Sequence, residues 1–196
     1  MTPQPGALVH LATPRFVLRS MAREDVTDGF IAWLADPEVM LGLNLPRRRL
    51  SRPQAVRFVL AHDNVTKFCL GIFDKANSRQ IGFFTVNVDP RNRTGETSVV
   101  IGERVYWGKD VVREARSALL DFMFDTLDVH KVIGRPHARN FASIYNYQAL
   151  GFRCEAVLRE QLLSVDRSTR IDQMMFGILR SEWHAKRPAE AARLAS

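Results

Sequence analysis

The chain has 196 residues, of which 46% are hydrophobic, and it carries a formal net charge of +7. This length and apolar content are sufficient to bury one sizeable core, so we expect one domain. The sequence contains no run near the roughly eighteen apolar residues that a membrane span requires, and its start lacks the basic and apolar segments of a secretion signal. We therefore expect a cytoplasmic protein with no membrane partner.

Charge and cysteine usage narrow the classes of partner. The excess of Lys and Arg, with a local cluster at Arg47–Arg49, favours anionic ligands, although such a cluster is equally compatible with a face that only meets water. A nucleic-acid partner is not expected, because the basic residues are neither interleaved with exposed aromatics nor gathered on one recognition helix. Cys69 and Cys154 lie in apolar, strand-like runs without CxxC or Cys/His spacing, so we expect two buried free thiols and no disulfide or metal site.

The first third of the chain predicts an arm, one strand and two helices. Residues 1–13 lack periodicity and are expected to form a flexible N-terminal arm. Phe16–Arg19 predicts a strand, and residues 23–34 predict a helix with an acidic start that Asp36-Pro37 ends. Ser51, with a proline two residues later, begins a second helix.

Three strands and a long helix follow. Apolar runs at residues 68–73, 81–88 and 96–101 are separated by turns, which predicts an antiparallel meander. The helix that begins near Val111 has an apolar stripe and a polar side at 3.6-residue spacing. The stripe consists of Val112, Ala115, Leu119, Phe122 and Met123, and the polar side of Arg113, Arg116, Asp121 and Asp125.

The last third predicts a crossover unit and a hairpin. Lys131–Arg135 is a short strand that runs parallel to its predecessor if the crossover has the usual right hand. Asn140 begins a helix that Gly151 ends, and two strands flank the turn Asp166–Thr169. Because the Ala-rich, charged segment at the end has nothing to bury, we expect one domain over residues 14–184 and a fraying C-terminal tail over residues 185–196.

The junction between the third strand of the meander and the long helix has the features of an anion site. A β-branched run ending at Ile101 gives way to a turn containing Gly108 and then to a helix N-terminus at Val111. The first backbone N–H groups of a helix have no intrahelical partner, and the helix dipole makes that end electropositive, which suits a phosphate or pyrophosphate. The alternative is an ordinary strand-to-helix turn that binds nothing.

A second motif lies at the start of the next helix. Asn140, Ser143 and Tyr147 are spaced so that their polar groups project along one side of that helix. The alternative is that Asn140 is only the N-cap, Ser143 a first-turn residue and Tyr147 a half-buried side chain with its hydroxyl in water.

Together the two motifs resemble a known family. The residues Tyr106-Trp107-Gly108-Lys109 that open the long helix, the pattern Asn140-x-Ala142-Ser143 and the later Leu150-Gly151-Phe152 are similar to those of GNAT acetyltransferases, especially the Rim-type ribosomal-protein N-terminal acetyltransferases. The resemblance extends from about Pro14 to Trp183. It implies a mixed α/β (α+β) fold with a GNAT-like central, mostly antiparallel twisted sheet and helices on both faces.

The resemblance also implies acetyl-CoA as donor, an amine as acceptor, and no metal. The pyrophosphate would lie on the loop after the strand and at the helix start, the pantetheine arm would pair with the strand end, and Tyr147 would protonate the departing CoA thiolate. The implied cofactor-binding residues are Val99, Val100, Ile101, Val105, Trp107, Gly108, Lys109, Asp110, Val111, Val112, Asn140 and Ser143. The candidate catalytic residues are Tyr147, Glu96 and Ser143.

Acetyl transfer to an amine also needs a proton acceptor. An alkyl amine with a pKa near ~10 is only about 0.1% neutral at pH 7, so a base must remove a proton before nitrogen attacks the thioester. Glu96 is the first candidate and Glu103 the second, and the alternative is that each is only a surface carboxylate. Cys69 and Cys154 lie outside both motifs, so we expect direct transfer without an acyl-enzyme.

The loop departs from the family pattern at two positions. Val105 stands where Gln or Arg is usual, and Asp110 stands where Gly or Ala is usual. The Asp110 carboxylate could cap the N–H groups that a pyrophosphate would use, with Lys109 offsetting part of the repulsion. These departures keep open a second interpretation, a catalytically weak GNAT-fold binding or regulatory module.

The acceptor is expected between the first two helices and the last hairpin, over residues 36–53 and 162–172. The mixed charges of those segments do not select among a protein N-terminus, a polyamine, an amino sugar and a small xenobiotic amine. A homodimer is also left open, because family members often dimerise although no feature of this sequence demands it.

Overall fold

The computed structural model describes the backbone of residues 6–194 and the side chains of residues 6–187. Within that range the strands form one eight-stranded sheet in the order β1-β2-β3-β4-β5-β6-β8-β7. The strands are β1 (His10–Ala12), β2 (Phe16–Ser20), β3 (Lys67–Asp74), β4 (Gln80–Asp89), β5 (Thr94–Ile101), β6 (Lys131–Gly134), β7 (Arg153–Leu163) and β8 (Arg170–Leu179). The helices are α1 (Asp28–Ala35), α2 (Pro37–Leu41), α3 (Arg52–Leu60), α4 (Val111–Asp121), α5 (Phe141–Ala149) and α6 (Arg180–Leu194), with short helical turns at η1 (Arg23–Asp25), η2 (Arg104–Tyr106) and η3 (Phe122–Thr126).

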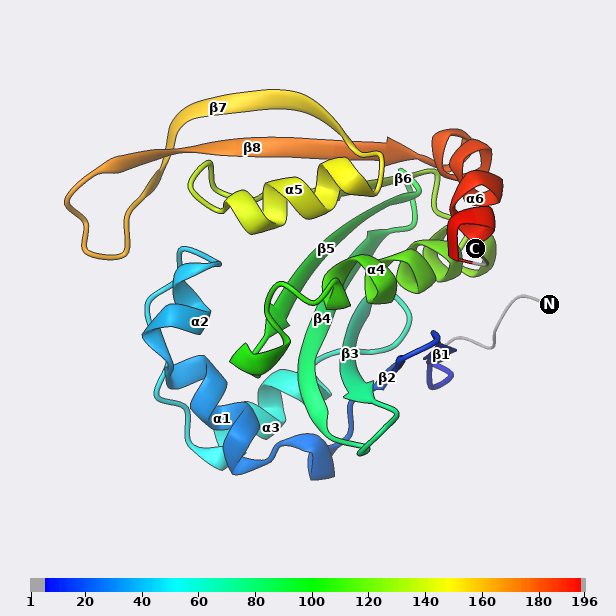
Figure 1. Ribbon diagram of the computed structural model, residues 1–196. Coiled ribbons are helices and arrows are strands. Elements are labelled where there is room, and N and C mark those ends of the chain that lie inside the picture. Colours follow the sequence, from blue (N-terminus) through cyan, green and yellow to red (C-terminus); the bar gives the residue numbers. More distant parts are fainter. Residues whose placement is uncertain (1–5, 195–196) are drawn as a thin grey trace.

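The sheet is mostly antiparallel, as predicted. Neighbouring strands run antiparallel everywhere except between β5 and β6, which are parallel because α4 crosses over between them. The predicted meander is formed by β3, β4 and β5. Figure 1 shows the twisted sheet and the β7–β8 hairpin, which projects beyond the helices.

Helices cover both faces of the sheet, which confirms the expected fold class. On one face α4, α5 and α6 pack against the strands, and the largest buried residues there include Phe68, Phe84, Phe176 and Trp183. On the other face α1, α2 and α3 pack around Phe30, Phe83 and Trp33. The central strand β4 contributes to both cores, with Phe84 and Val86 in the first and Phe83 in the second. Burial of this apolar area supplies the main stabilisation.

Three helices follow β2, where the sequence predicts two. Asp36-Pro37 does end α1, but the same residues also begin α2. The Asp36 carboxylate accepts a hydrogen bond from Glu38 N at 2.9 Å, and Pro37 occupies the first turn. Proline is well suited to that place because its missing N–H would have no partner there. The Ser51 start of α3 is as predicted.

The flexible-arm prediction is wrong for residues 10–12, which form β1 against β2. Val9 N donates to Ser20 Oγ at 2.9 Å, and Val9 is buried in the core. The reason is a contact far along the chain. Glu114 on α4 accepts hydrogen bonds from Thr13 Oγ1 at 2.6 Å, from Arg15 N at 2.7 Å and from Arg15 Nε at 2.6 Å. Residues 1–5 lie outside the described part of the chain.

The C-terminal tail prediction is also wrong in its boundary, because α6 continues through residue 185 to Leu194. Trp183 is buried and donates from Nε1 to Asp121 at 2.9 Å, and Lys186 Nζ donates to the Ala149 carbonyl at the end of α5. These long-range contacts give the helix a buried side that the Ala-rich composition does not reveal. Residues 195 and 196 of the predicted tail lie outside the described residues.

The two cysteines differ in environment. Cys69 is buried on β3 as predicted, and burial raises the pKa of its thiol to about 12. Cys154 is exposed, contrary to the prediction, because β7 is the edge strand of the sheet and most of its side chains face solvent.

Glu114 should stabilise the fold in a pH-dependent way. Its hydrogen bonds, opposed by desolvation, hold the pKa of the carboxyl below its usual value. The stabilisation is therefore present above the unfolded-state pKa of about 4.3 and is lost as the pH falls through the lower folded-state pKa. We expect Glu114→Gln to lower the free energy of unfolding by about 1–3 kcal/mol at pH 7 in urea denaturation, with the difference vanishing in acid. Glu24→Gln, at an exposed position, is the control, and an equal loss in both variants would contradict the interpretation.

Candidate active site

The sheet opens between its two parallel strands. The ladder between β5 and β6 joins only Thr94–Glu96 to Lys131–Ile133, whereas β5 continues to Ile101. From Thr97 onward the edge of β5 that faces β6 is therefore free of strand partners. Unpaired backbone groups at such an edge can pair with an extended ligand.

A cavity of about 700 Å³ lies at this opening. Its walls come from the end of α2, from β5, from the loop and first turns of α4, from the β6–α5 loop and from α5. Of the residues predicted for the site, the cavity brings together Glu96, Val99, Val100, Ile101, Trp107, Gly108, Lys109, Asp110, Val111, Val112, Asn140, Ser143 and Tyr147. Val105 is not in this lining, because it lies in η2 with 65% of its surface exposed.

Tyr147 occupies the deep end of the opening. It is 3% exposed, and its hydroxyl donates to the carbonyl oxygen of Thr97 at 3.3 Å. Its ring stacks on Phe176 with a centroid separation of 5.4 Å. The ring also fits closely over Gly134, where an added Cβ would lie 2.0 Å from the tyrosine oxygen. Tyr147 is thus buried against the end of β6, which excludes the alternative of a half-buried side chain with its hydroxyl in water.

Asn140 acts as a cap and as a clamp. Its Oδ1 accepts from Ser143 N at 2.9 Å, as an N-cap does, and its Nδ2 donates to the Gly42 carbonyl at 2.6 Å. The side chain therefore ties the start of α5 to the end of α2 across the cavity.

The loop between β5 and α4 leaves room at its glycine. Gly108 has a φ of +72°, and an added Cβ would meet nothing within 4 Å. Trp107 closes the end of β5 by donating from Nε1 to the Ile101 carbonyl at 2.8 Å. The N-terminus of α4 at Val111 and Val112 lines the cavity directly behind this loop.

The structure differs from the expectation that Asp110 caps α4. Asp110 has a left-handed backbone, with φ +57°, and makes no capping hydrogen bond. An N-cap residue typically has an extended backbone, whereas the Asp110 backbone is left-handed and its carboxylate lies 3.2 Å from the Arg113 guanidinium. The first N–H groups of α4 are therefore not taken by this side chain.

The two candidate bases have different surroundings. Glu96 lines the cavity, is partly exposed and lies 3.5 Å from Arg135. Glu103 is outside the cavity lining, with Oε2 at 2.7 Å from Arg79 and Oε1 accepting from Trp33 Nε1 at 3.1 Å. The geometry therefore keeps Glu96 as the first candidate.

His137, in the β6–α5 loop, is a cavity residue that the sequence patterns miss. Its Nε2 lies 3.2 Å from the Leu41 carbonyl oxygen, and Nδ1 has no partner among the described residues. Burial lowers the pKa of this histidine, so the ring is neutral at pH 7 and Nδ1 carries a lone pair when Nε2 donates. Its only sequence signal is its place three residues before Asn140.

Arg116 is buried, so the prediction that it lies on the polar side of α4 is wrong. The spacing assigns it to the polar face of α4, yet it is 1% exposed and lies between the sheet and α5. The physical reason is that α5 covers a second side of α4, so this helix is buried over a wider arc than one apolar stripe.

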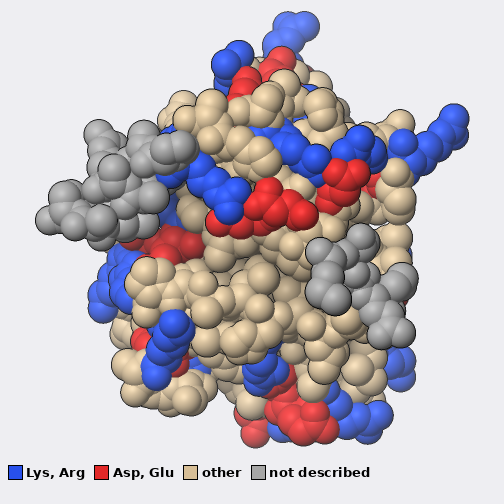
Figure 2. All heavy atoms as spheres, turned by 90° about the vertical axis from the view of Figure 1, so that its right-hand side faces the viewer, with Lys and Arg blue, Asp and Glu red and all other residues tan. Residues whose placement is uncertain are grey.

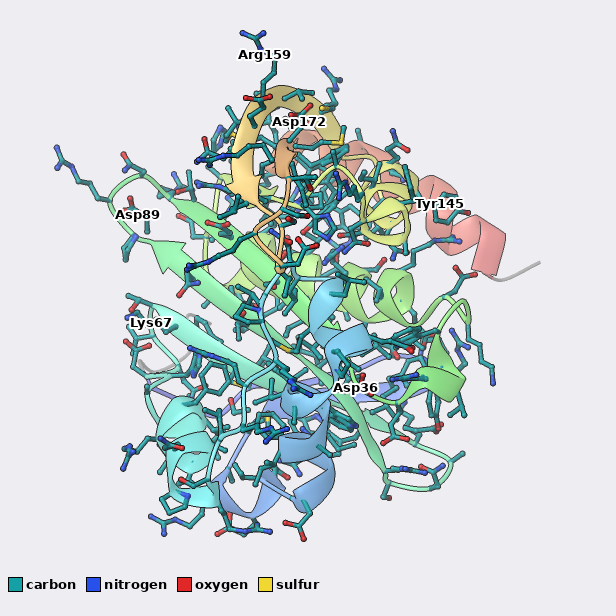
Figure 3. The ribbon with its side chains drawn as sticks, turned by 90° about the vertical axis from the view of Figure 1, so that its left-hand side faces the viewer. Asp36, Lys67, Asp89, Tyr145, Arg159 and Asp172 are labelled. Atoms are coloured by element: carbon teal, nitrogen blue, oxygen red, sulfur yellow. The ribbon has the colours of Figure 1, made fainter. Side chains whose placement is uncertain are left out.

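Charges of both signs lie on the surface drawn in Figure 2. On the face drawn in Figure 2, Lys and Arg side chains are interspersed with Asp and Glu. Figure 3 looks from the side on which α2 lies below α5, with Tyr145 on α5 and Asp36 between α1 and α2.

In the part of the chain that the structure describes, every helix is too short or too polar to cross a membrane.

The family is decided by comparison with known proteins. The model of the Acetyltransferase (GNAT) domain family matches residues 15–153. The chain belongs to the GNAT family. The uncharacterized N-acetyltransferase p20 of Bacillus licheniformis is 29% identical to this acetyltransferase over 179 residues, which cover 88% of this chain and 97% of the relative.

Solved structures share the fold of this acetyltransferase. Ribosomal-protein-S5-alanine acetyltransferase from Vibrio fischeri has a TM-score of 0.77 at 17% identity, covering 89% of this chain and 98% of its own. Spermidine N-acetyltransferase from Vibrio cholerae, solved with CoA and spermine, has a TM-score of 0.75 at 21% identity, covering 86% and 97%. The family and the relative from Bacillus licheniformis establish an acetyl-CoA-dependent N-acetyltransferase that acts on amines.

Gly134 should be essential for the geometry of the site. Gly134→Ala forces the Tyr147 ring to move, so we expect the unfolding midpoint to fall, with an overpacking cost of about 1–3 kcal/mol. Displacement of a site residue by about 1 Å can cost ~10²-fold, so acetyl transfer, measured as thiol release from acetyl-CoA, should fall at least tenfold.

Gly29→Ala in α1 is the matched control, because its added Cβ meets only Thr27 Oγ1 at 3.5 Å. Full activity and an unchanged midpoint in Gly134→Ala would contradict the close fit.

Proposed function

We propose that this acetyltransferase moves the acetyl group from acetyl-CoA directly to a primary amine within the cavity between β5, α4 and α5. The observation that carries the proposal is the coincidence of three features in one cavity: the unpaired edge of β5, the N-terminus of α4 and the buried hydroxyl of Tyr147. The edge of β5 suits the extended arm of the donor, the N-terminus of α4 suits its pyrophosphate, and the Tyr147 hydroxyl suits its sulfur.

The residues around the loop fit a CoA group. Open space at Gly108 allows close approach to the backbone, and the uncapped N–H groups of α4 suit a pyrophosphate. Lys109 adds a positive charge beside them. Val99–Ile101 offer strand-edge groups to the amide arm, and Asn140 and Ser143 lie across the cavity from them.

The thioester supplies the acetyl group, and the chain supplies proton acceptors, donors and orientation. Glu96 takes the proton of the incoming ammonium, directly or through water, because it is the carboxylate of β5 within the cavity. His137 is a second proton acceptor in the lining, with a free Nδ1 lone pair. Backbone N–H groups of β5 polarise the thioester carbonyl, and Tyr147 acts as general acid toward the leaving thiolate.

The acceptor is expected at the end of the cavity formed by α2 and the β7–β8 hairpin, where Glu38, Leu162 and Gln173 contribute to the lining. The names of the structural neighbours include ribosomal-protein-S5-alanine and spermidine as acceptors. We therefore propose a peptide N-terminus as the first acceptor class, with polyamines as the second class to be screened.

Acetyl-CoA should stabilise the protein, and Asp110 should limit its affinity. At a hundred times the dissociation constant the ligand adds about 2.7 kcal/mol, which raises the unfolding midpoint by roughly 5–11 °C at ~2–4 °C per kcal/mol. Gly108→Trp should abolish the shift by filling the open space. Asp110→Gly should tighten binding ~2–5-fold by removing a negative charge from the helix N-terminus.

Asp110→Asn is the control for backbone effects, because asparagine also tolerates the left-handed conformation. An unchanged dissociation constant in both variants would overturn the role given to Asp110. The absence of any shift at millimolar acetyl-CoA would favour the regulatory-module interpretation of the cavity over catalysis in it.

Tyr147→Phe tests the general acid. We expect kcat for thiol release, with alanine-terminated peptides or spermidine as acceptors, to fall about 10²-fold while KM for acetyl-CoA changes little. Tyr145→Phe removes a hydroxyl from an exposed tyrosine of the same helix and should cost less than ~3-fold. Equal kcat values for Tyr147→Phe and the unmodified enzyme would rule out the assignment.

A further inference from the structure

Arg116 is a buried cation that has no counter-ion among the residues that the structure describes. It lies in the second turn of α4, and its Nε and both Nη atoms have no hydrogen-bond partner among the described residues. Burial lowers the pKa of its guanidinium, but an arginine side chain remains protonated at neutral pH. An unpaired buried charge is among the most costly features a fold can contain.

The carboxylates of the same helix are engaged elsewhere. Glu114 binds Arg15 at 2.6 Å, Asp110 lies beside Arg113, and Asp121 accepts from Trp183. The Arg116 charge is therefore neither offset by its own helix nor exposed to water. The guanidinium instead faces two aromatic rings.

The guanidinium lies over the face of the Tyr147 ring, 4.4 Å from its centroid, and 5.5 Å from the centroid of Phe84. A cation attracts the electron-rich face of an aromatic ring, and it attracts a phenolate more strongly. Arg116 also belongs to the cavity lining.

A second polar group of the same region lacks a partner. Thr97 lies opposite Val86 and Val99 opposite Phe84, so the Thr97 side chain is on the face of the sheet that carries Phe84 and Arg116. Its Oγ1 is buried without a partner among the described residues, next to the carbonyl that accepts from Tyr147. The deep end of the cavity thus holds a cation and a hydroxyl that have no hydrogen-bond partner among the described residues.

We propose that Arg116 is a positioning residue for acetyl transfer, which holds the Tyr147 ring and stabilises the negative charge that forms on its oxygen. This rests on the proposed function of Tyr147. As the C–S bond of the tetrahedral intermediate breaks, the Tyr147 O–H bond breaks too, and its proton passes to the sulfur. The phenolate left behind faces the Arg116 cation until water returns a proton.

The proposal predicts opposite changes in stability and catalysis. Arg116→Met replaces the cation with an apolar side chain of similar length, so the unfolding midpoint should rise by ~2–8 °C because an unpaired buried charge is removed. The same change should lower kcat for thiol release from acetyl-CoA ~10–100-fold, with KM for acetyl-CoA within ~2-fold. Arg57→Met, at an exposed position of α3, removes the same charge and should change neither quantity.

A double-mutant cycle separates this role from a structural one. In a Tyr147→Phe background, which has no proton to give, Arg116→Met should lower kcat less than ~2-fold. Multiplicative losses in the double variant, or full kcat in Arg116→Met alone, would overturn the proposal. If Tyr147→Phe keeps full kcat, the proposed general acid itself has failed, which is a distinct outcome.

Arg116→Lys covers the case in which Arg116→Met does not fold. It keeps the charge but loses the planar group over the ring, so its kcat should lie between those of the unmodified enzyme and Arg116→Gln. Equal kcat values for the Lys and Gln variants would contradict a role for the charge.

Discussion

The short parallel ladder between β5 and β6 is the constraint on which the rest of the molecule depends. Two strands that pair over only Thr94–Glu96 and then separate leave a gap, which opens into the cavity. Tyr147 closes the inner end of this gap, where Gly134 has no side chain in its way. The crossover helix α4 begins beside this gap, so the free strand edge, the helix N-terminus and the buried hydroxyl of the proposed site lie together.

Charges of both signs line this opening, with Glu38, Glu96 and Asp110 on one hand and Lys109, Arg116 and Arg135 on the other. The N-terminus of α4 and Lys109 lie at its outer end, and Arg116 lies at its inner end. A charge at the rim costs little because water solvates it, whereas a buried cation weakens the fold unless it is paired. The buried Arg116 charge lowers the free energy of unfolding. In the proposed reaction the same charge is already in place to stabilise the negative charge that develops during acyl transfer.

The two sides of the cavity are coupled through α2. Asn140 and His137 both reach from the β6–α5 loop region to the end of that helix, at Gly42 and Leu41. The end of α2, which is proposed to contact the acceptor, is thereby held by Asn140 and His137. Asn140 is also one of the residues proposed to contact CoA. In the proposed reaction this connection would keep the amine and the thioester in register, because acyl transfer is sensitive to small displacements.

Much of this protein follows from local patterns. The apolar runs of β3, β4 and β5 and the caps at Ser51 and Asn140 depend on interactions within a few residues, which is why most of the elements could be predicted. The fold class and the predicted lining residues followed instead from the resemblance that the two motifs carry.

The remaining features depend on partners distant in sequence. Arg116 is buried because α5 covers a second side of α4, β1 forms because Glu114 holds Thr13 and Arg15, and α6 persists because Trp183 reaches Asp121. Helical periodicity shows which side of a helix is apolar, but it carries no information on how many neighbours will cover that helix. That number, and with it the burial of a charged side chain, is decided only when the tertiary structure forms.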